Sequence, residues 1–177
     1  MDALIVVDVQ NDFCPGGALA VHEGDAVIEP INRLAEQMPF VVATRDWHPA
    51  DHLSFAERGG PWPAHCVKGT PGAQLHPGIE TSRIDAFVDT GQEPADEGYS
   101  GFDGTRLERL LRERGVDTVH VAGLALDYCV KATALDAKRA GFDVVVHLDG
   151  TRAVEVTPGD GERAVHELRE AGVKVLG

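Results

Sequence analysis

Apolar residues along the chain gather in six short runs, separated by longer and more polar segments. The runs are rich in β-branched residues and are bounded by turn-forming residues, a pattern typical of buried β-strands. We predict strands at residues 4–9, 40–45, 86–90, 118–124, 143–148 and 173–176.

The segments between these runs carry apolar residues at helical spacing. Three of them end at a glycine (Gly115, Gly141 or Gly172), which often terminates a helix because it adopts a left-handed conformation at little cost. Strands that are apolar throughout and separated by helices predict a three-layer α/β/α fold, with a mostly parallel six-stranded sheet covered on both faces. We predict helices near residues 25–38, 104–115, 128–140 and 160–171.

Length and composition limit the possible organisation and partners. The chain has 177 residues, of which 43% are hydrophobic, so we expect a single domain over residues 1–177. Lys and Arg number 16 against 29 Asp and Glu, which gives a net charge of -13. A surface this acidic argues against nucleic acid or an anionic membrane as partner. The charge does not identify a small neutral substrate, and it leaves a homo-oligomer open.

The start of the chain and its cysteines indicate a cellular location. The apolar start is short, lacks a basic region and reaches an acidic residue at Asp8, so it does not resemble a signal peptide. No apolar stretch approaches transmembrane length. Cys14, Cys66 and Cys129 are an odd number without zinc-finger spacing, which fits reduced thiols better than disulfides. We therefore expect a cytoplasmic protein.

One cysteine stands where a predicted strand gives way to a helix, in the sequence VHVAGLALDYCVKATALDA. Asp127 suits an N-cap, so Cys129 lies near a helix N-terminus, where backbone N–H groups and the helix dipole favour a thiolate. Taken alone, a buried core cysteine is the more common explanation. However, Asp8, Asp46 and His48 also follow strands, and parallel sheets bind ligands beyond the carboxyl ends of their strands. This convergence favours Cys129 as a nucleophile.

The long irregular segment after the second strand holds a further group of reactive side chains. Asp46 and His48 are two positions apart, so they point to the same side of an extended chain. His52 and His65 follow. One carboxylate with two or three imidazoles suits a divalent zinc, manganese or iron ion. Solvated loop histidines are the alternative, and spacing alone does not decide between the two.

Four sequence matches follow one another along nearly the whole chain: LIVVDVQNDFCPGGALAV, then DWHPADHLSF with WPAHCVKGTPGAQLHP, then YSGFDGT, then GLALDYCVKATALDA. Together they resemble the nicotinamidase (pyrazinamidase) branch of the isochorismatase-like cysteine hydrolases. The resemblance implies the isochorismatase-like hydrolase fold and a cytoplasmic enzyme of NAD salvage and pyridine nucleotide biosynthesis. It also implies hydrolysis of nicotinamide to nicotinate and ammonia through a cysteine thioester. The metal-binding segments favour this branch over isochorismatase itself.

The resemblance also implies roles for particular residues. Asp8 would take the proton of Cys129, which attacks the carboxamide carbon. Backbone N–H groups of Ala125 and Cys129 would form the oxyanion hole, with a cis peptide bond between Leu124 and Ala125. Three aromatic side chains would line the substrate pocket: Phe13, Trp62 and Tyr99. Core packing is the alternative for Phe13 and Trp62.

The same resemblance implies one divalent metal ion that orients the pyridine ring through its nitrogen. Zinc is the first expectation, with iron or manganese as alternatives. The ion would be held by Asp46, His48 and His65, with His52 nearby.

One position departs from the family pattern. The family's catalytic lysine comes nine residues before the tyrosine of YSGF, where this chain has Thr90. The triad would then be Asp8, Thr90 and Cys129, and a hydroxyl can hydrogen-bond but carries no charge. Lys68 is the nearest loop lysine that could substitute. Three functions remain open: a metal-dependent nicotinamidase with a weakened or modified mechanism, a hydrolase of another small carboxamide, and a non-catalytic ligand-binding homologue.

Overall fold

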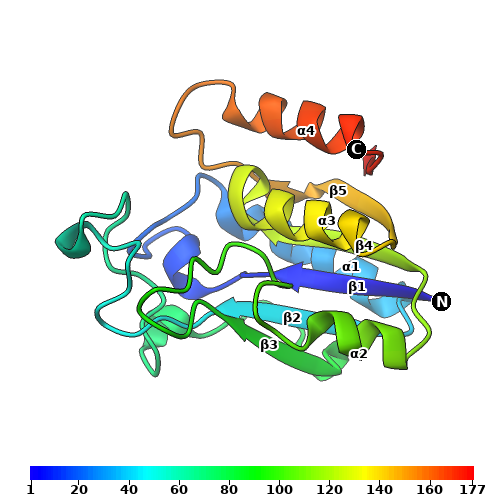
Figure 1. Ribbon diagram of the computed structural model, residues 1–177, viewed down its shortest axis with the longest axis horizontal. Helices are drawn as coiled ribbons and strands as arrows, with labels where there is room; N and C mark the ends of the chain where they lie inside the picture. The colour runs from blue at the N-terminus through cyan, green and yellow to red at the C-terminus, as the bar shows by residue number, and fades with distance from the viewer.

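The protein is built around a six-stranded parallel sheet with helices on both faces (Figure 1). The computed structural model describes residues 1–177. The sheet order is β3-β2-β1-β4-β5-β6, and every neighbouring pair of strands is parallel. The predicted three-layer fold is confirmed, with a sheet that is wholly rather than mostly parallel. The strands are β1 (Asp2–Val7), β2 (Val41–Asp46), β3 (Ala86–Thr90), β4 (Thr118–Leu124), β5 (Asp143–Arg152) and β6 (Lys174–Leu176).

Four α-helices cover the sheet: α1 (Ile28–Gln37), α2 (Leu107–Glu113), α3 (Lys131–Arg139) and α4 (Asp160–Glu170). Figure 1 shows α2, α3 and α4 on one face of the sheet and α1 on the other. One core cluster contains residues of α2, α3 and α4, and the second core cluster contains residues of α1. No helix of the chain has the length and apolar character needed to cross a bilayer. Short helical turns lie in the connections, at Asn11–Phe13, Gly24–Val27, Ala56–Arg58, Pro71–Ala73 and Thr81–Arg83.

Three helices begin differently from the sequence prediction. The first, α1, begins at Ile28 rather than at residue 25, because the short helical turn Gly24–Val27 precedes it. The helix α2 begins at Leu107 rather than at residue 104, after a turn in which the Thr105 hydroxyl donates to the carbonyl oxygen of Gly101 (2.6 Å) and accepts from the backbone N–H of Leu107 (3.2 Å). The predicted helix over 128–140 has two parts, a π-helical turn at Leu126–Val130 and then α3. Such turns are frequent at functional sites, and this one carries Cys129.

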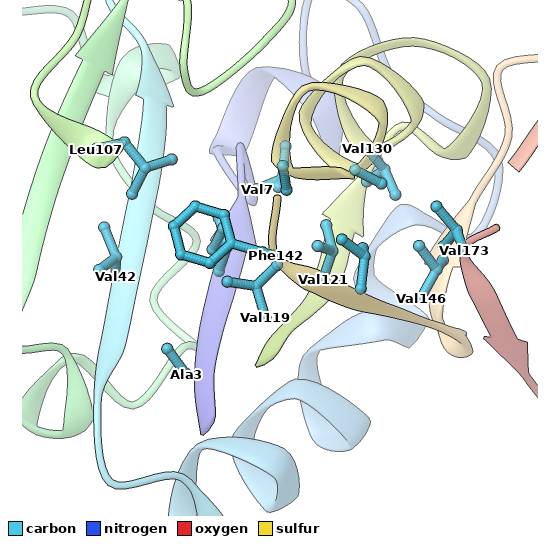
Figure 2. Close-up of a cluster of buried hydrophobic side chains, with 14 of the residues drawn as sticks. Ala3, Val7, Val42, Leu107, Val119, Val121, Val130, Phe142, Val146 and Val173 are labelled. Carbon is cyan, nitrogen blue, oxygen red and sulfur yellow. The ribbon is translucent and has the colours of Figure 1, made fainter. Parts of the chain in front are cut away.

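Side chains along each strand alternate between the two faces of the sheet. In β1, Ala3, Ile5 and Val7 join the cluster beneath α2, α3 and α4, whereas Leu4 and Val6 join the cluster on the α1 side. All five are almost completely buried, which explains why β1 is apolar throughout. Figure 2 shows part of the first cluster, with side chains from strands and helices in contact, among them Ala3, Val7, Val42, Leu107, Val119, Val121 and Val130.

The carboxyl ends of the parallel strands lie along one edge of the sheet, at the left in Figure 1, where the segment over 47–77 lies. Asp8 directly follows β1, Asp46 ends β2 and Thr90 ends β3. Cys129 lies in the turn after β4. The chemically reactive residues singled out in the sequence therefore meet at the edge where parallel sheets bind ligands.

Candidate active site

Three reactive side chains from separate strand ends meet in a buried group, which we call the nucleophile cluster: Asp8, Asp46 and Cys129. One donor atom from each, a carboxylate oxygen or the sulfur, lies within 4.8 Å of the other two, and all three residues are buried. Asp8 has a φ of 48°. Such a backbone conformation is unfavourable for a residue with a side chain and is often retained at functional sites.

The protonation equilibria in this cluster differ from the sequence expectation of a thiolate. Burial, followed by the charge of Asp8, raises the pKa of the Cys129 thiol well above its ordinary value. Burial, followed by the charge of Asp46, likewise raises the pKa of Asp8. The hydroxyl of Thr44 donates to Oδ1 of Asp8 (2.7 Å), a contact that the sequence analysis did not predict. The thiol is therefore neutral at rest and needs Asp8 to accept its proton.

Lys68 does not replace the missing lysine. Its ammonium is in an exposed position and donates to the carbonyl oxygen of Gln92 (2.5 Å). Thr90 occupies the predicted position at the end of β3, but its hydroxyl lies 3.1 Å from Oδ1 of Asp46. Asp8 instead has the Thr44 hydroxyl as its partner.

A second group, the metal cluster, shares Asp46 and adds two imidazoles: Asp46, His48 and His65. Nε2 of His48 and Nε2 of His65 lie 3.3 and 3.7 Å from Oδ2 of Asp46. Nδ1 of His48 and Nδ1 of His65 each lie 2.8 Å from a backbone carbonyl oxygen. Because a carbonyl only accepts, each Nδ1 carries the hydrogen, and each Nε2 turns an electron pair toward the carboxylate. This is the orientation found in metal-ligating histidines, and the donor set fits a divalent transition metal ion.

The titration behaviour of the metal cluster shows its preference for a positive charge, because in place of an ion a proton on Nε2 of an imidazole can donate to Asp46. Burial alone would raise the pKa of Asp46, but contacts with His48 and His65 lower it far below its ordinary range. Burial alone would lower the pKa of His48, but its contact with Asp46 raises it. The three side chains thus favour a positive charge among them, which a bound cation would supply.

The structure does not bring His52 into the metal cluster. Its ring stacks on that of His48, with centroids 3.8 Å apart. Nε2 of His52 donates to the carbonyl oxygen of Asp96 (2.5 Å), and its Nδ1 accepts from the hydroxyl of Ser54 (2.7 Å). Both nitrogens therefore have protein partners. His52 supports the His48 ring from one side and has no electron pair left for an ion.

Gln10 is a further residue of the site that the sequence analysis missed. Its side chain is completely buried, and its Oε1 accepts from the backbone N–H of Asp46 (2.9 Å). Its Nε2 donates to the carbonyl oxygens of Asp46 (2.7 Å) and Ala73 (2.8 Å). The position of this amide two residues after Asp8 was the available signal, since a polar side chain directly after a buried strand needs partners.

One cavity connects the two clusters, with an empty volume of about 360 Å³ including its opening to solvent. Cys129 and Ala125 lie on its wall, together with Asp46 and His65 of the metal cluster. The peptide bond between Leu124 and Ala125 is cis, as expected. The other lining residues are Phe13, Leu19, Val21, Trp62, Tyr99, Tyr128 and Val154.

The three predicted aromatic residues line this cavity, and Tyr128 adds a fourth that the sequence analysis did not name. Nε1 of Trp62 donates to the hydroxyl of Tyr99 (3.0 Å). The Tyr128 ring meets Trp62 edge-on, with centroids 5.1 Å apart. The position of Tyr128 directly before Cys129 was the signal for its place in the wall. The cavity suits a small, flat, mostly apolar ligand.

Comparison with known proteins identifies the family. The chain matches the isochorismatase domain over residues 2–177. It is 46% identical to the nicotinamidase/pyrazinamidase of Mycobacterium tuberculosis, over 99% of this chain and 98% of that protein. The structure of the pyrazinamidase of Pyrococcus horikoshii in complex with zinc has a TM-score of 0.93 and 46% identity, and covers 99% of this chain and 98% of that one. A protein of L. infantum in complex with nicotinate has a TM-score of 0.94 and 44% identity, with 99% and 92% covered. The chain therefore belongs to the isochorismatase family.

Proposed function

We propose that this protein is a metal-dependent nicotinamidase, which hydrolyses nicotinamide to nicotinate and ammonia. The observation that carries the proposal is that one cavity is shared by both clusters, because Cys129 lies on its wall together with Asp46 and His65. A small pyridine carboxamide in this cavity can contact the thiol and the metal cluster at the same time. Similarity to a nicotinamidase/pyrazinamidase, to a zinc-bound pyrazinamidase and to a nicotinate-bound protein supports this substrate.

The nucleophile cluster supplies the groups for the reaction. The Cys129 thiol gives its proton to the Asp8 carboxylate, and the sulfur attacks the carboxamide carbon. The carbon–nitrogen bond breaks, and ammonia leaves with the proton returned by Asp8. Water, deprotonated by Asp8, then attacks the thioester carbon, which releases nicotinate and restores the thiol.

The turn that holds Cys129 also places backbone groups near the reacting carbon. Ala125 and Cys129 both line the cavity, and their N–H groups would receive the negative oxygen that forms during attack. Losing one such donor typically costs about 3–4 kcal/mol of barrier. The aromatic wall around them limits the access of water and the rotation of a flat substrate.

The metal cluster provides the second anchor. Asp46, His48 and His65 would hold a divalent ion, which would supply a fixed positive charge for the pyridine nitrogen. Zinc is the first choice because the donor set is one carboxylate and two imidazoles, with iron and manganese as alternatives. We place this activity in the cytoplasm, as a step of NAD salvage.

Thr90 favours a second candidate, a hydrolase of another small carboxamide. A lysine at this position would place a positive charge near the buried carboxylates, whereas a hydroxyl places none. Such a change alters the charge that the site offers to its substrate and nucleophile. A binding protein without catalysis is disfavoured because Asp8 and Cys129 lie together in the same buried cluster.

Ammonia release tests these alternatives directly. Purified protein is incubated with nicotinamide, pyrazinamide, benzamide and an aliphatic carboxamide, and the metal content of the same sample is measured. We expect turnover of the two heteroaromatic amides and about one equivalent of a transition metal per chain. Turnover of the aliphatic amide alone would support the second candidate, and no ammonia from any amide would contradict the enzymatic function.

A further inference from the structure

The hydroxyl of Thr90 contacts a carboxylate of the metal cluster. Thr90 is buried at the end of β3 and is the cross-strand partner of Asp46 on β2. Its Oγ1 lies 3.1 Å from Oδ1 of Asp46 and 3.3 Å from the carbonyl oxygen of Arg45. The parallel register of β2 and β3 therefore aligns this hydroxyl with Asp46.

The carboxylate is the better acceptor of the two. A hydroxyl has one hydrogen to donate, and a hydrogen bond to a charged group is stronger than one to a neutral carbonyl. A carboxylate must be deprotonated to serve as a metal ligand, so Asp46 offers a charged acceptor when it holds an ion. The Thr90 hydroxyl is also closer to Oδ1 of Asp46 than to the carbonyl oxygen of Arg45.

The bond at Oδ1 fixes the direction of the other carboxylate oxygen. The last torsion of an aspartate side chain is soft, so an unrestrained carboxylate can turn away from a ligand. Oδ2 of Asp46 faces Nε2 of both imidazoles. Gln10 holds the backbone N–H and carbonyl of Asp46, and Thr90 holds its side chain. Asp46 is thereby restrained at three atoms, which leaves Oδ2 directed at the ion site.

We infer that Thr90 is a positioning residue of the metal cluster, whose hydroxyl orients Asp46 for metal binding, and that it is not a member of the catalytic group. This inference rests on the proposed metal site. It reassigns the position at which the family pattern has a catalytic lysine, and it leaves Asp8 and Cys129 as a catalytic pair.

Zinc affinity of purified variants tests the inference without any activity measurement. Thr90→Val keeps the shape of the side chain and removes the hydroxyl, and Thr90→Ser keeps the hydroxyl. Zinc dissociation constants are measured by competition with a chromophoric chelator. Loss of a hydrogen bond that orients a ligand typically weakens metal binding about 10–100-fold. We expect this loss in Thr90→Val and an affinity within about threefold of wild type in Thr90→Ser.

Thr44 provides a matched control from the neighbouring strand. Its hydroxyl is also buried and also donates to an aspartate, but to Asp8 of the nucleophile cluster. Thr44→Val should therefore leave zinc affinity unchanged. An equal loss in Thr44→Val and Thr90→Val would assign the effect to general loosening of the strand ends and overturn the inference.

Three further outcomes are decisive. If Thr90→Val does not fold, Thr90→Ala and Thr90→Ser provide the comparison, because they differ only in the hydroxyl; equal zinc affinities in these two variants would overturn the inference. If wild-type protein binds no zinc, iron or manganese, the proposed metal site itself is wrong. If the wild type binds metal and every Thr90 variant binds it with the same affinity, the proposed metal site stands and only the role of Thr90 is wrong.

Discussion

The backbone of Gly91 lies against the ring of His48. The carbonyl oxygen of Gly91 is 2.8 Å from Nδ1 of His48, and a Cβ on Gly91 would lie 2.4 Å from Cε1 of the same ring. Gly91 also has a φ of 60°, which few other residues adopt at low cost. A residue with no side chain is therefore needed directly after Thr90 if His48 is to keep its orientation.

Gly91→Ala should displace His48 and weaken zinc binding at least about tenfold. The left-handed backbone adds about 1–2 kcal/mol of destabilisation. Gly115→Ala is the control, because Gly115 has a φ of 67° and no atom within 4 Å of the position of its Cβ. Zinc titration and thermal unfolding of both proteins separate the two effects. Equal zinc affinity in the two variants would contradict the role given to Gly91.

Cys129→Ala should abolish amide hydrolysis and leave the fold intact, because the cavity loses its nucleophile. Cys14→Ala and Cys66→Ala should keep most of the activity. Burial raises the pKa of Cys14 to about 11 and raises that of Cys66 further, so neither thiol is ionised at neutral pH. Ammonia release and circular dichroism of the three variants give the comparison. Loss of activity in Cys66→Ala alone would identify a different nucleophile.

Much of the fold could be predicted from the sequence because its signals are local and redundant. The buried run of β1 and the glycine after α3 each indicate an element without knowledge of the tertiary structure. The π-helical turn at Leu126–Val130 could not be predicted in this way. Its residues have helical spacing, and the extra residue per turn becomes visible only once β4 and α3 are placed.

The reactive side chains of the candidate site could be proposed from the sequence, whereas most of the groups that hold them in place could not. Cys129 and Asp46 stand out because a thiol in the turn after β4 and a carboxylate at the end of β2 lie where parallel sheets bind ligands. Thr44 is hidden in a strand, where a threonine is ordinary, and its partner Asp8 is known only from the pairing of β1 with β2. His52 has a ligand-like spacing, yet Ser54 and a backbone carbonyl occupy its nitrogens. Sequence spacing does not reveal such competing partners.

A pair of histidines far from the cavity should make stability depend on pH. Nδ1 of His120 lies 2.8 Å from Nε2 of His147, and Nε2 of His120 lies 3.1 Å from a carboxylate oxygen of Asp2. Burial, followed by the charge of His120, lowers the pKa of His147, whereas Asp149 opposes this shift. In the unfolded chain His147 regains a pKa of about 6.5. The unfolded state then binds more protons, and this contribution to stability is lost as the pH falls below about 6.5.

Thermal unfolding at pH 7.5 and pH 5.5 measures this effect. The unfolding temperature of the wild type should be lower at pH 5.5 than at pH 7.5, and this decrease should be smaller in His147→Gln. His166→Gln is the control, because the His166 side chain is largely exposed and lies on the surface of α4. The same fall in wild type and His147→Gln would show that other groups carry the pH dependence.

The last prediction concerns Thr90→Lys, which places an ammonium beside the buried carboxylates. In wild type the pKa of Asp8 is raised by burial and by Asp46, so the acidic limb of the profile of kcat/KM against pH should lie above that of an ordinary carboxyl. A nearby positive charge favours the ionised forms of both Asp8 and Cys129 and lowers both pKa values. The acidic limb should therefore move to lower pH, because Asp8 stays ionised further into the acid range. Nicotinamide turnover should rise, and a tenfold gain requires only about 1.4 kcal/mol of barrier. The ammonium can still donate to Asp46, so zinc content should be retained. An unchanged acidic limb in a protein that retains zinc would contradict the titration of Asp8 as the cause of that limb.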